Sequence, residues 1–395
     1  MKGHIRKRGE DSWELKYDIG PDPLTGRRRI RYCTFRGARR KAEEKLRELL
    51  YQVDRGEHVD PTKITVTDLL DRWLKHAGSQ VSPKTHERYA QLVEKNIAPI
   101  LGEHKLRALR SIHIDEAWSR LLADGRLDGK GGLSPQTVKH CHRVLKQALG
   151  QAVRWQLLAR NPADYVDPPR VPRKELIVLD PMATARLLKG IKETQFYIPT
   201  LIAVLTGLRR GEVLALRWRH VDLDSGRLSV IQSLEQTKAG LRFKETKNRR
   251  ARHVVMPPLL RSGLRAHKVR QAEALLGLGV RQTDETLVVC RYDGAPMNPE
   301  YLSREFPVAV TRMGLPRVNF HNLRHSHATQ MLLCGVHPKI TQERLGHSSI
   351  SITMDLYSHL VPGLQGEAAE KVDAVLRRAL KNTSQASPGG NSGGN

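Results

Sequence analysis

The sequence predicts an α+β multidomain protein: a small β-sheet-plus-helix N-terminal module, an all-α bundle, and a mostly α third domain with a small antiparallel sheet. With 395 residues, the chain is longer than one ordinary hydrophobic core accommodates. Apolar and polar residues alternate near the N-terminus and again around residues 228–256, whereas helical periodicity fills most of the remainder. A basic, proline-rich segment separates the second part from the third.

Residues 1–60 are predicted to form the N-terminal module. The run Trp-Glu-Leu-Lys-Tyr-Asp-Ile from Trp13 alternates as a strand does, residues 21–26 supply a turn, and an arginine-rich return strand leads to a helix over residues 42–53. No acidic residue occurs between Pro23 and Ala42. A basic ribbon of this kind fits a DNA groove, and a solvated basic face is the alternative. The candidate DNA-binding residues here are Arg27, Arg28, Arg29 and Arg31.

Residues 64–165 predict an all-helical bundle. Val66, Leu69 and Trp73 recur on one helical face, and both Ser82-Pro83 and Ser134-Pro135 are helix starts in which serine caps and proline takes the first position. Asn161-Pro162 stops the helical pattern. The polar face either follows a phosphate backbone or is plain solvated surface. Its basic residues are Lys84, Arg88, Lys139, His140, Arg143 and Lys146.

The charge balance indicates a polyanionic partner. There are 67 Lys and Arg against 41 Asp and Glu, a net charge of +26 with a pI near 10.2, which favours nucleic acid, although ribosome-associated and membrane-surface proteins are as basic. No apolar run approaches the roughly 20 residues of a bilayer span, and no apolar stretch follows the basic N-terminus. We therefore expect a cytoplasmic protein without a membrane partner.

The four cysteines indicate neither a disulfide framework nor a zinc knuckle. Cys33, Cys141, Cys290 and Cys334 are far apart and form no CxxC pair. We expect reduced thiols, most of them buried.

A predicted linker over residues 166–174 leads to a third domain over residues 175–380, and a tail over 381–395 has too little apolar content to fold. Residues 228–234 and 241–247 read as strands around a Lys238-Ala239-Gly240 turn, and residues 253–256 as a short third strand. The other patterns of this domain are helical.

The third domain carries an ordered series of short motifs. Thr206-Gly207-Leu208-Arg209 opens a helix, with Glu212 three residues later on the same face. The series continues with Lys247 after the hairpin, His321-Asn322-Leu323-Arg324, Leu345-Gly346-His347, and Tyr357 ten positions after His347. Each motif alone is weak, because a lone tyrosine or histidine is more often a core or surface group than a reacting one.

Together these motifs resemble the tyrosine recombinase, or phage integrase, family. The family pattern is an arginine in a TGLRxxE segment, a hairpin lysine, an HxxR pair, an LGH segment and a tyrosine about ten residues later. The resemblance covers residues 175–380, and the two preceding parts look like the arm-binding and core-binding domains of integrases. One departure is His220, where relatives usually carry Asp.

The resemblance implies a site-specific DNA recombinase that cleaves and rejoins DNA through a 3′-phosphotyrosine on Tyr357. Arg209 and Arg324 would clamp the non-bridging phosphate oxygens with forked donors. His321 would be the general base, Lys247 would protonate the leaving 5′ oxygen with Lys244 as the fallback, and His347 would hydrogen-bond the phosphate. The implied partners are double-stranded DNA at attachment core and arm sites, three further copies of this chain in a homotetramer, and a directionality factor or DNA-bending protein.

We expect no cofactor and no metal. A phosphotyrosine conserves the energy of the broken bond, and the sequence contains neither a GxxxxGK[ST] phosphate loop nor an Asp/Glu cluster suited to two Mg²⁺ ions. The competing hypothesis is a zinc site on His321 and His325, four residues apart. Asn322 stands where a zinc peptidase has its glutamate, and Arg324 would place a cation beside the ion.

Integration or excision of a phage or other mobile element is the function we expect, because a separate N-terminal module is typical of such integrases. The alternatives are a chromosome or plasmid dimer resolvase of the same family, a catalytically silent DNA-binding regulator, and a type IB topoisomerase. The complete set of six candidate catalytic residues argues against the regulator.

Overall fold

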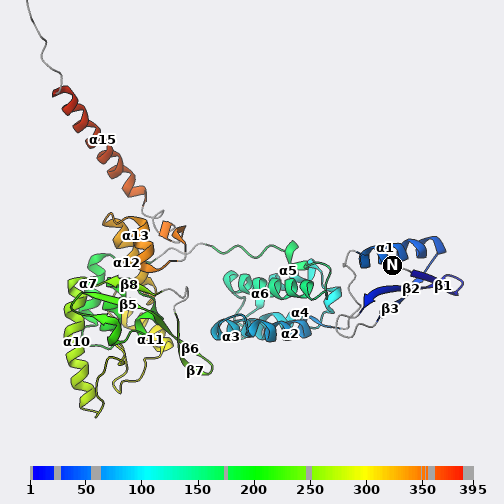
Figure 1. Cartoon of the computed structure of the whole chain (residues 1–395), viewed down its shortest axis with the longest axis horizontal. Coiled ribbons are helices and arrows are strands. Elements are labelled where there is room, and N and C mark those ends of the chain that lie inside the picture. Colours follow the sequence, from blue (N-terminus) through cyan, green and yellow to red (C-terminus); the bar gives the residue numbers. More distant parts are fainter. Residues whose placement is uncertain are drawn as a thin grey trace, which may run out of the picture. The chain divides into compact units, whose positions relative to one another are not determined.

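The computed structural model describes residues 3–21, 28–54, 64–172, 177–245, 251–347, 349–351, 353–354 and 361–385. The predicted fold class is confirmed, since helices dominate and the strands of the described residues form small antiparallel sheets (Figure 1). The chain divides into two compact units, Met1–Arg173 and Lys174–Asn395. Across the described residues, no helix is both long and apolar enough to cross a membrane.

The N-terminal module is a three-stranded sheet covered by one helix. Its strands follow the order β1 (Gly3–Gly9), β2 (Ser12–Pro21) and β3 (Arg28–Arg36), and α1 spans Arg39–Asp54. Leu15 and Tyr17 of β2 are buried with apolar side chains of α1. Strand β1 was not predicted, because Ile5 is its one large apolar side chain and leaves no alternation to detect.

The bundle that follows begins its helices where predicted. The hydroxyls of Ser82 and Ser134 accept hydrogen bonds from backbone N–H groups one turn on, at 3.4 and 3.2 Å. The longest helix of the bundle ends at Arg154, before the predicted stop at Asn161. The elements are α2 (Val66–Gly78), α3 (Pro83–Leu92), a π-turn (Val93–Ile97), α4 (Ala98–Leu101), a 3₁₀ turn (Leu106–Ala108), α5 (Ser111–Asp124), α6 (Pro135–Arg154) and a 3₁₀ turn (Pro162–Tyr165).

The second unit packs its helices around a nearly wholly buried helix, α8, and two small sheets. Its helices are α7 (Pro181–Gly190), α8 (Tyr197–Thr206), α9 (Arg210–Leu214), a 3₁₀ turn (Trp218–His220), α10 (Pro258–Leu276), α11 (Pro299–Arg312), α12 (Asn322–Leu333), α13 (Pro338–Leu345) and α15 (Val361–Gln385). Its strands are β4 (Val221–Asp222), β5 (Arg227–Val230), β6 (Gln232–Thr237), β7 (Gly240–Glu245) and β8 (Arg252–Val255). Strands β4, β5 and β8 form one sheet and β6 and β7 the other.

Two predictions for this unit differ from the structure. The strand predicted over residues 228–234 is broken at Ile231, and its halves join different sheets, because alternation reveals a strand but not its partner. Helix α15 continues to Gln385, into the segment predicted as the unfolded tail.

Two glycines bring the elements of the site together. Gly207 ends α8 with φ +69°, a left-handed conformation that lets the chain turn at once into α9. Gly211 packs closely against β6, because a Cβ at this position would clash with the carbonyl oxygen of Leu234 at 2.7 Å. The N-terminal end of α9 is therefore held between α8 and the β6–β7 hairpin.

Candidate functional site

Arg324 is the most deeply buried charged side chain of the candidate set, with 2% of its surface exposed. From α12 it donates to the carbonyl oxygen of Gly207 at 2.7 Å and to that of Leu345 at 2.8 Å. Burial and the neighbouring Arg209 charge lower the pKa of Arg324 to about 9, which keeps the guanidinium charged at neutral pH. The side chain joins the turn after α8 to the end of α13.

Arg209 stands at the start of α9, in a capping box with Glu212. Its backbone N–H donates to one Glu212 oxygen at 2.9 Å and its Nη1 to the other at 2.9 Å. Its Nη2 donates to the carbonyl oxygen of Gly346 at 2.9 Å. Arg209 and Glu212, which the sequence places on one helical face, thus form an ion pair.

Three consecutive carbonyls at the C-terminal end of α13 each accept a hydrogen bond from a different arginine. The donors are Arg252 to Arg344 at 3.2 Å, Arg324 to Leu345 at 2.8 Å and Arg209 to Gly346 at 2.9 Å. The last carbonyls of a helix lack partners within it and carry partial negative charge. The positively charged guanidiniums are therefore stabilised at this helix end. Because these bonds use only part of the five donors of each guanidinium, Arg209 and Arg324 retain N–H groups for an external anion.

His347 follows this helix end directly, after Gly346 with φ +67°. Its Nδ1 lies 2.9 Å from the hydroxyl of Thr353, which is fully buried. Partial burial, followed by the charges of Arg324 and Arg209, lowers the pKa of His347 to about 3. The ring is therefore neutral at physiological pH.

His321 is the N-cap residue of α12, where its exposed side chain makes no capping hydrogen bond. Its ring meets that of His325 edge-on, with centroids 4.8 Å apart. Although His321 keeps solvent-exposed surface, the surrounding protein and then the charges of His325 and Arg324 lower its pKa to about 4. It too is neutral at physiological pH, the protonation state that a general base requires.

Two of the six candidate catalytic residues, Lys247 and Tyr357, lie outside the described residues. The fallback lysine, Lys244, forms an ion pair with Glu235 across the β6–β7 hairpin. Arg209, His321, Arg324 and His347 come together from the start of α9, from α12 and from the segment after α13.

Sequence reasoning missed Arg252 and Thr353. Arg252 donates to both oxygens of Glu212, at 3.0 and 2.6 Å, and so supports Arg209 from β8. An arginine within a basic stretch and a threonine near the LGH segment carry no pattern that separates them from surface residues. Within the described ranges, no group of three or more His, Cys, Asp or Glu side chains is placed to hold a metal ion.

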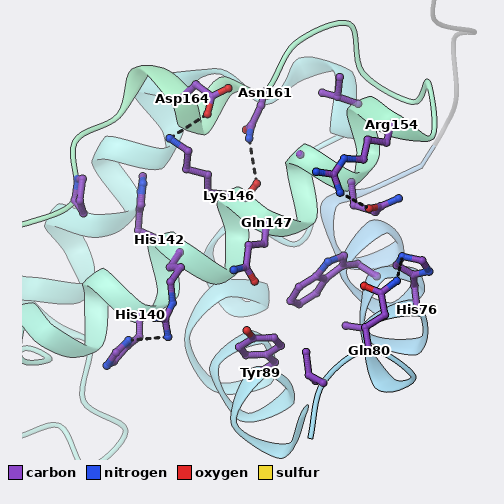
Figure 2. Close-up of a pocket in the computed structure, with 18 of the residues that line it drawn as sticks. His76, Gln80, Tyr89, His140, His142, Lys146, Gln147, Arg154, Asn161 and Asp164 are labelled. Carbon is purple, nitrogen blue, oxygen red and sulfur yellow. Dashed lines mark hydrogen bonds and ion pairs between the residues drawn. The ribbon is translucent and has the colours of Figure 1, made fainter. Parts of the chain in front are cut away.

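The helical bundle contains an open hollow of about 1090 Å³ between α2, α3 and α6 (Figure 2). Lys139 and Arg143, predicted to bind DNA, line it together with His140 and Lys146. Tyr89 and Gln147, which no sequence pattern singles out, point into it in Figure 2.

The two other predicted DNA-binding residues of the bundle, Lys84 and Arg88, are not part of the lining of this hollow. Both lie on α3, where Lys84 is 3.9 Å from the carboxylate of Glu87 and Arg88 donates to Gln91 at 2.6 Å.

The predicted arginines of the N-terminal sheet do not all share one face. Arg31 lies opposite the buried Tyr17 in the β2–β3 register and thus on the face that packs on α1. Arg28 is largely exposed and pairs with Asp18, Arg29 lies in β3, and Arg27 is outside the described residues. Strand alternation across the register places further exposed basic residues on the open face: Arg6, Lys16 and Arg36.

Two family models match the chain. Residues 178–362 match the phage integrase family, and residues 65–122 match the N-terminal SAM-like domain of phage integrases. The first match contains every candidate catalytic residue and the second most of the helical bundle.

Relatives match over nearly the whole chain. The ICEBs1 integrase of Bacillus subtilis (strain 168) is 26% identical over 94% of this chain and 100% of its own length. A tyrosine recombinase XerC-like protein of Caldanaerobacter subterraneus subsp. tengcongensis is 28% identical over 95% of this chain and 99% of its own length. The Tn1549 transposon integrase, solved in complex with transposon right-end DNA, has a similar fold, with a TM-score of 0.66 and 22% identity over 78% of this chain and 100% of that one.

The second unit has the fold of a tyrosine recombinase catalytic domain, with two guanidiniums held at one helix end. This chain belongs to the phage integrase family of site-specific tyrosine recombinases.

Proposed function

We propose that this recombinase integrates and excises a mobile element at DNA attachment sites, with Tyr357 as its nucleophile. The observation that carries the proposal is the end of α13, where two guanidiniums and the neutral ring of His347 converge while keeping donors for a phosphate. The relatives support it, since the Bacillus subtilis protein that matches nearly the whole chain is named an integrase.

Arg209 and Arg324 stabilise the charge that develops during attack. When the Tyr357 oxygen bonds to the phosphorus, negative charge concentrates on the non-bridging oxygens of the pentacoordinate phosphate. Forked guanidinium donors match these oxygens in pairs, which a lysine cannot do. Because both arginines are anchored before DNA arrives, little reorganisation accompanies the reaction.

Proton transfer completes the exchange. As the bond between Tyr357 and phosphorus forms, the phenol proton passes to neutral His321, and the bond to the 5′ oxygen breaks as that oxygen takes a proton from Lys247. The product is a 3′-phosphotyrosine and a free 5′ hydroxyl. Attack by the 5′ hydroxyl of another strand reverses every step and rejoins the DNA.

His347 donates to the phosphate through Nε2. When the hydroxyl of Thr353 donates to Nδ1, the ring carries its hydrogen on Nε2, the nitrogen that faces away from Thr353. Thr353 therefore acts through His347 as a positioning residue for this hydrogen bond.

DNA is held by two separate surfaces. The hollow of the bundle, lined by Lys139 and Arg143, takes the core site, and Lys84 and Arg88 add phosphate contacts from α3. The open face of the N-terminal sheet, with Arg28 and Arg36, takes an arm site. Recombination between two duplexes cuts four strands, and one tyrosine per chain then requires a homotetramer.

Strand exchange through a phosphotyrosine is nearly isoenergetic and has no direction of its own. Integration and excision therefore call for a directionality factor or a DNA-bending protein as a further partner. Since the substrate is chromosomal DNA, we place the reaction in the bacterial cytoplasm.

The test is covalent capture on a suicide substrate, a core site nicked so that the cleaved end diffuses away. The wild type should accumulate a protein–DNA adduct on denaturing gels, and Tyr357→Phe should form none while binding DNA as tightly, because the lost hydroxyl contributes little to an interface dominated by phosphate contacts. Tyr292→Phe is the control, because this tyrosine is 76% exposed in the same unit and has no proposed role. An adduct from Tyr357→Phe in wild-type yield would place the nucleophile elsewhere.

A further inference from the structure

His327 is a buried histidine of the second unit to which the proposed chemistry gives no role. It lies on α12, three residues after Arg324, and only 8% of its surface is exposed. Its Nδ1 lies 2.9 Å from the carbonyl oxygen of Val204, and its Nε2 lies 3.2 Å from Nε of Arg344. Both ring nitrogens thus have partners, and those partners belong to α8 and α13.

The partners determine the tautomer of His327. The Nε of a guanidinium is always a donor, so Nε2 of His327 must accept from Arg344. The ring hydrogen is then on Nδ1, which donates to Val204. Burial and the charge of Arg344 lower the pKa of His327 to about 4, in agreement with a neutral ring.

His327 and Arg344 together satisfy the end of α8. An α-helix leaves its last four carbonyls without partners, and those of Val204 and Leu205 are among them. His327 takes the first, and Nη2 of Arg344 takes the second at 2.9 Å. The helix end that leads into Gly207 and Arg209 is therefore fastened to α12 and α13 at two adjacent carbonyls.

The ring of His327 also packs beneath the turn itself. A Cβ added to Gly207 would lie 2.8 Å from Cδ2 of His327, so ring and turn are in direct contact. The carbonyl of Gly207 is in turn the acceptor of Arg324. The position of the His327 ring thus fixes the distance between the turn that carries Arg209 and the helix that carries Arg324.

We propose that His327 is a positioning residue for the arginine pair: its neutral ring, held between Val204 and Arg344, sets the spacing of Arg209 and Arg324 around the scissile phosphate. This role rests on the proposed assignment of the two arginines as the phosphate clamp. His327 touches no substrate and acts through the turn at Gly207 and the end of α13.

Four substitutions test the two hydrogen bonds of His327. His327→Phe fills the ring volume and removes both bonds. His327→Asn offers an amide N–H near the place of Nδ1 and keeps the bond to Val204, whereas His327→Gln offers an amide oxygen near the place of Nε2 and keeps the bond from Arg344. Arg344→Leu removes the partner itself.

The first readout is the single-turnover rate of adduct formation at saturating suicide substrate, and the second is the dissociation constant for core-site DNA. The third is the urea unfolding curve, from which the folded fraction under assay conditions is calculated. For His327→Phe we expect a rate lower by about 10²-fold, the size typical of a misplaced catalytic group, with an unchanged dissociation constant and full folding under assay conditions. His327→Gln should recover most of the rate. The double variant His327→Phe/Arg344→Leu should be no slower than the slower single variant.

Two outcomes would overturn the positioning role: a wild-type rate in His327→Phe, or a rate that falls only in proportion to the folded fraction. Arg209→Lys, assayed in parallel, tests the underlying assignment by itself. A wild-type rate in Arg209→Lys overturns the proposed function, whereas a slow Arg209→Lys beside a fast His327→Phe overturns the positioning role alone.

Discussion

Arg252 donates to both carboxylate oxygens of Glu212, at 3.0 and 2.6 Å, and so ties the first residue of β8 to α9. Glu212 is 3% exposed. Burial by itself would raise the pKa of Glu212, but the hydrogen bonds and charge of Arg252 outweigh it, with a further contribution from Arg209, and the net shift is downward. The carboxylate therefore stays ionised in the interior and holds Arg209 in place.

Arg252→Ala should destabilise the second unit strongly. Removing one partner of a buried ion pair costs up to about 3–5 kcal/mol, and here Arg209 remains to compensate part of the Glu212 charge. Urea unfolding of the full chain measures the loss. The matched control is Arg265→Ala, whose partner Asp224 is 96% exposed and for which a loss below about 1 kcal/mol is expected. Equal losses in the two variants would mean that Glu212 is not held by Arg252 in solution.

Arg324→Lys should keep the positive charge and still slow cleavage by at least about 10²-fold, the usual effect of losing one strong donor to a developing oxyanion. A lysine amine also cannot bond to the carbonyls of Gly207 and Leu345 and to a phosphate in the same geometry. Single-turnover adduct formation tests this, with core-site affinity measured alongside. A lysine variant that cleaves at the wild-type rate would show that a point charge is sufficient.

The open face of the N-terminal sheet should bind DNA independently of cleavage. Changing Arg6, Lys16 and Arg36 to Ala should weaken arm-site binding and flatten its salt dependence, by about 0.9 in the logarithmic slope for each DNA phosphate that the variant no longer neutralises. Adduct formation on an isolated core site should not change. Arg31→Ala is the comparison, because Arg31 lies on the face that packs on α1 and should affect folding of the module more than the salt slope. An unchanged slope in the triple variant would exclude this face as the arm-site surface.

Stability should fall as the pH drops from about 6.5 to about 4. Above the ordinary pKa of 6.5, His327 is neutral in both the folded and the unfolded state. Below that pH the unfolded chain binds a proton at His327, whereas the folded protein stays unprotonated there until the pH reaches its lowered pKa of about 4. Each such histidine lowers the unfolding free energy by roughly 1.4 kcal/mol per pH unit in this window. The lowered pKa of Glu212 adds a loss only below its ordinary value of 4.5.

The check for His327 is urea unfolding at pH 7.5 and pH 5 for the wild type and His327→Asn. The variant cannot take up that proton and should lose less stability between the two pH values. The same loss in both proteins would mean that His327 is protonated in the folded state over this range.

Adduct formation should continue in excess EDTA, because protein groups fill every role that a metal could take. In the proposed mechanism Arg209 and Arg324 neutralise the phosphate, and Tyr357 takes the place of a metal-bound hydroxide as nucleophile. A zinc site on His321, His325 and His347 would behave in the opposite way, since chelation would remove the attacking water. Stoichiometric zinc by elemental analysis, together with loss of cleavage on chelation, would contradict the phosphotyrosine mechanism.

The sequence alone determined the features that depend on neighbours along the chain. Ser82 and Ser134 predict the starts of their helices, because a capping side chain bonds to backbone groups within one turn. Gly207 predicts a turn, because a left-handed backbone conformation favours glycine. The order of Arg209, Lys247, His321, Arg324, His347 and Tyr357 was equally readable, since each occurs in a short motif of characteristic residues.

Only the tertiary structure decided how Arg209, Arg324 and Arg252 are held. Their acceptors at the end of α13 are backbone carbonyls, and every residue has one, so no side chain in the sequence marks them. For the same reason the sequence did not predict the role of His327, because its ring is held by the carbonyl oxygen of Val204 and by Arg344, which lie on two other helices. Strand faces were undecided for a related reason: the register that puts Arg31 opposite Tyr17 is a relation between two strands, and alternation within either one does not contain it.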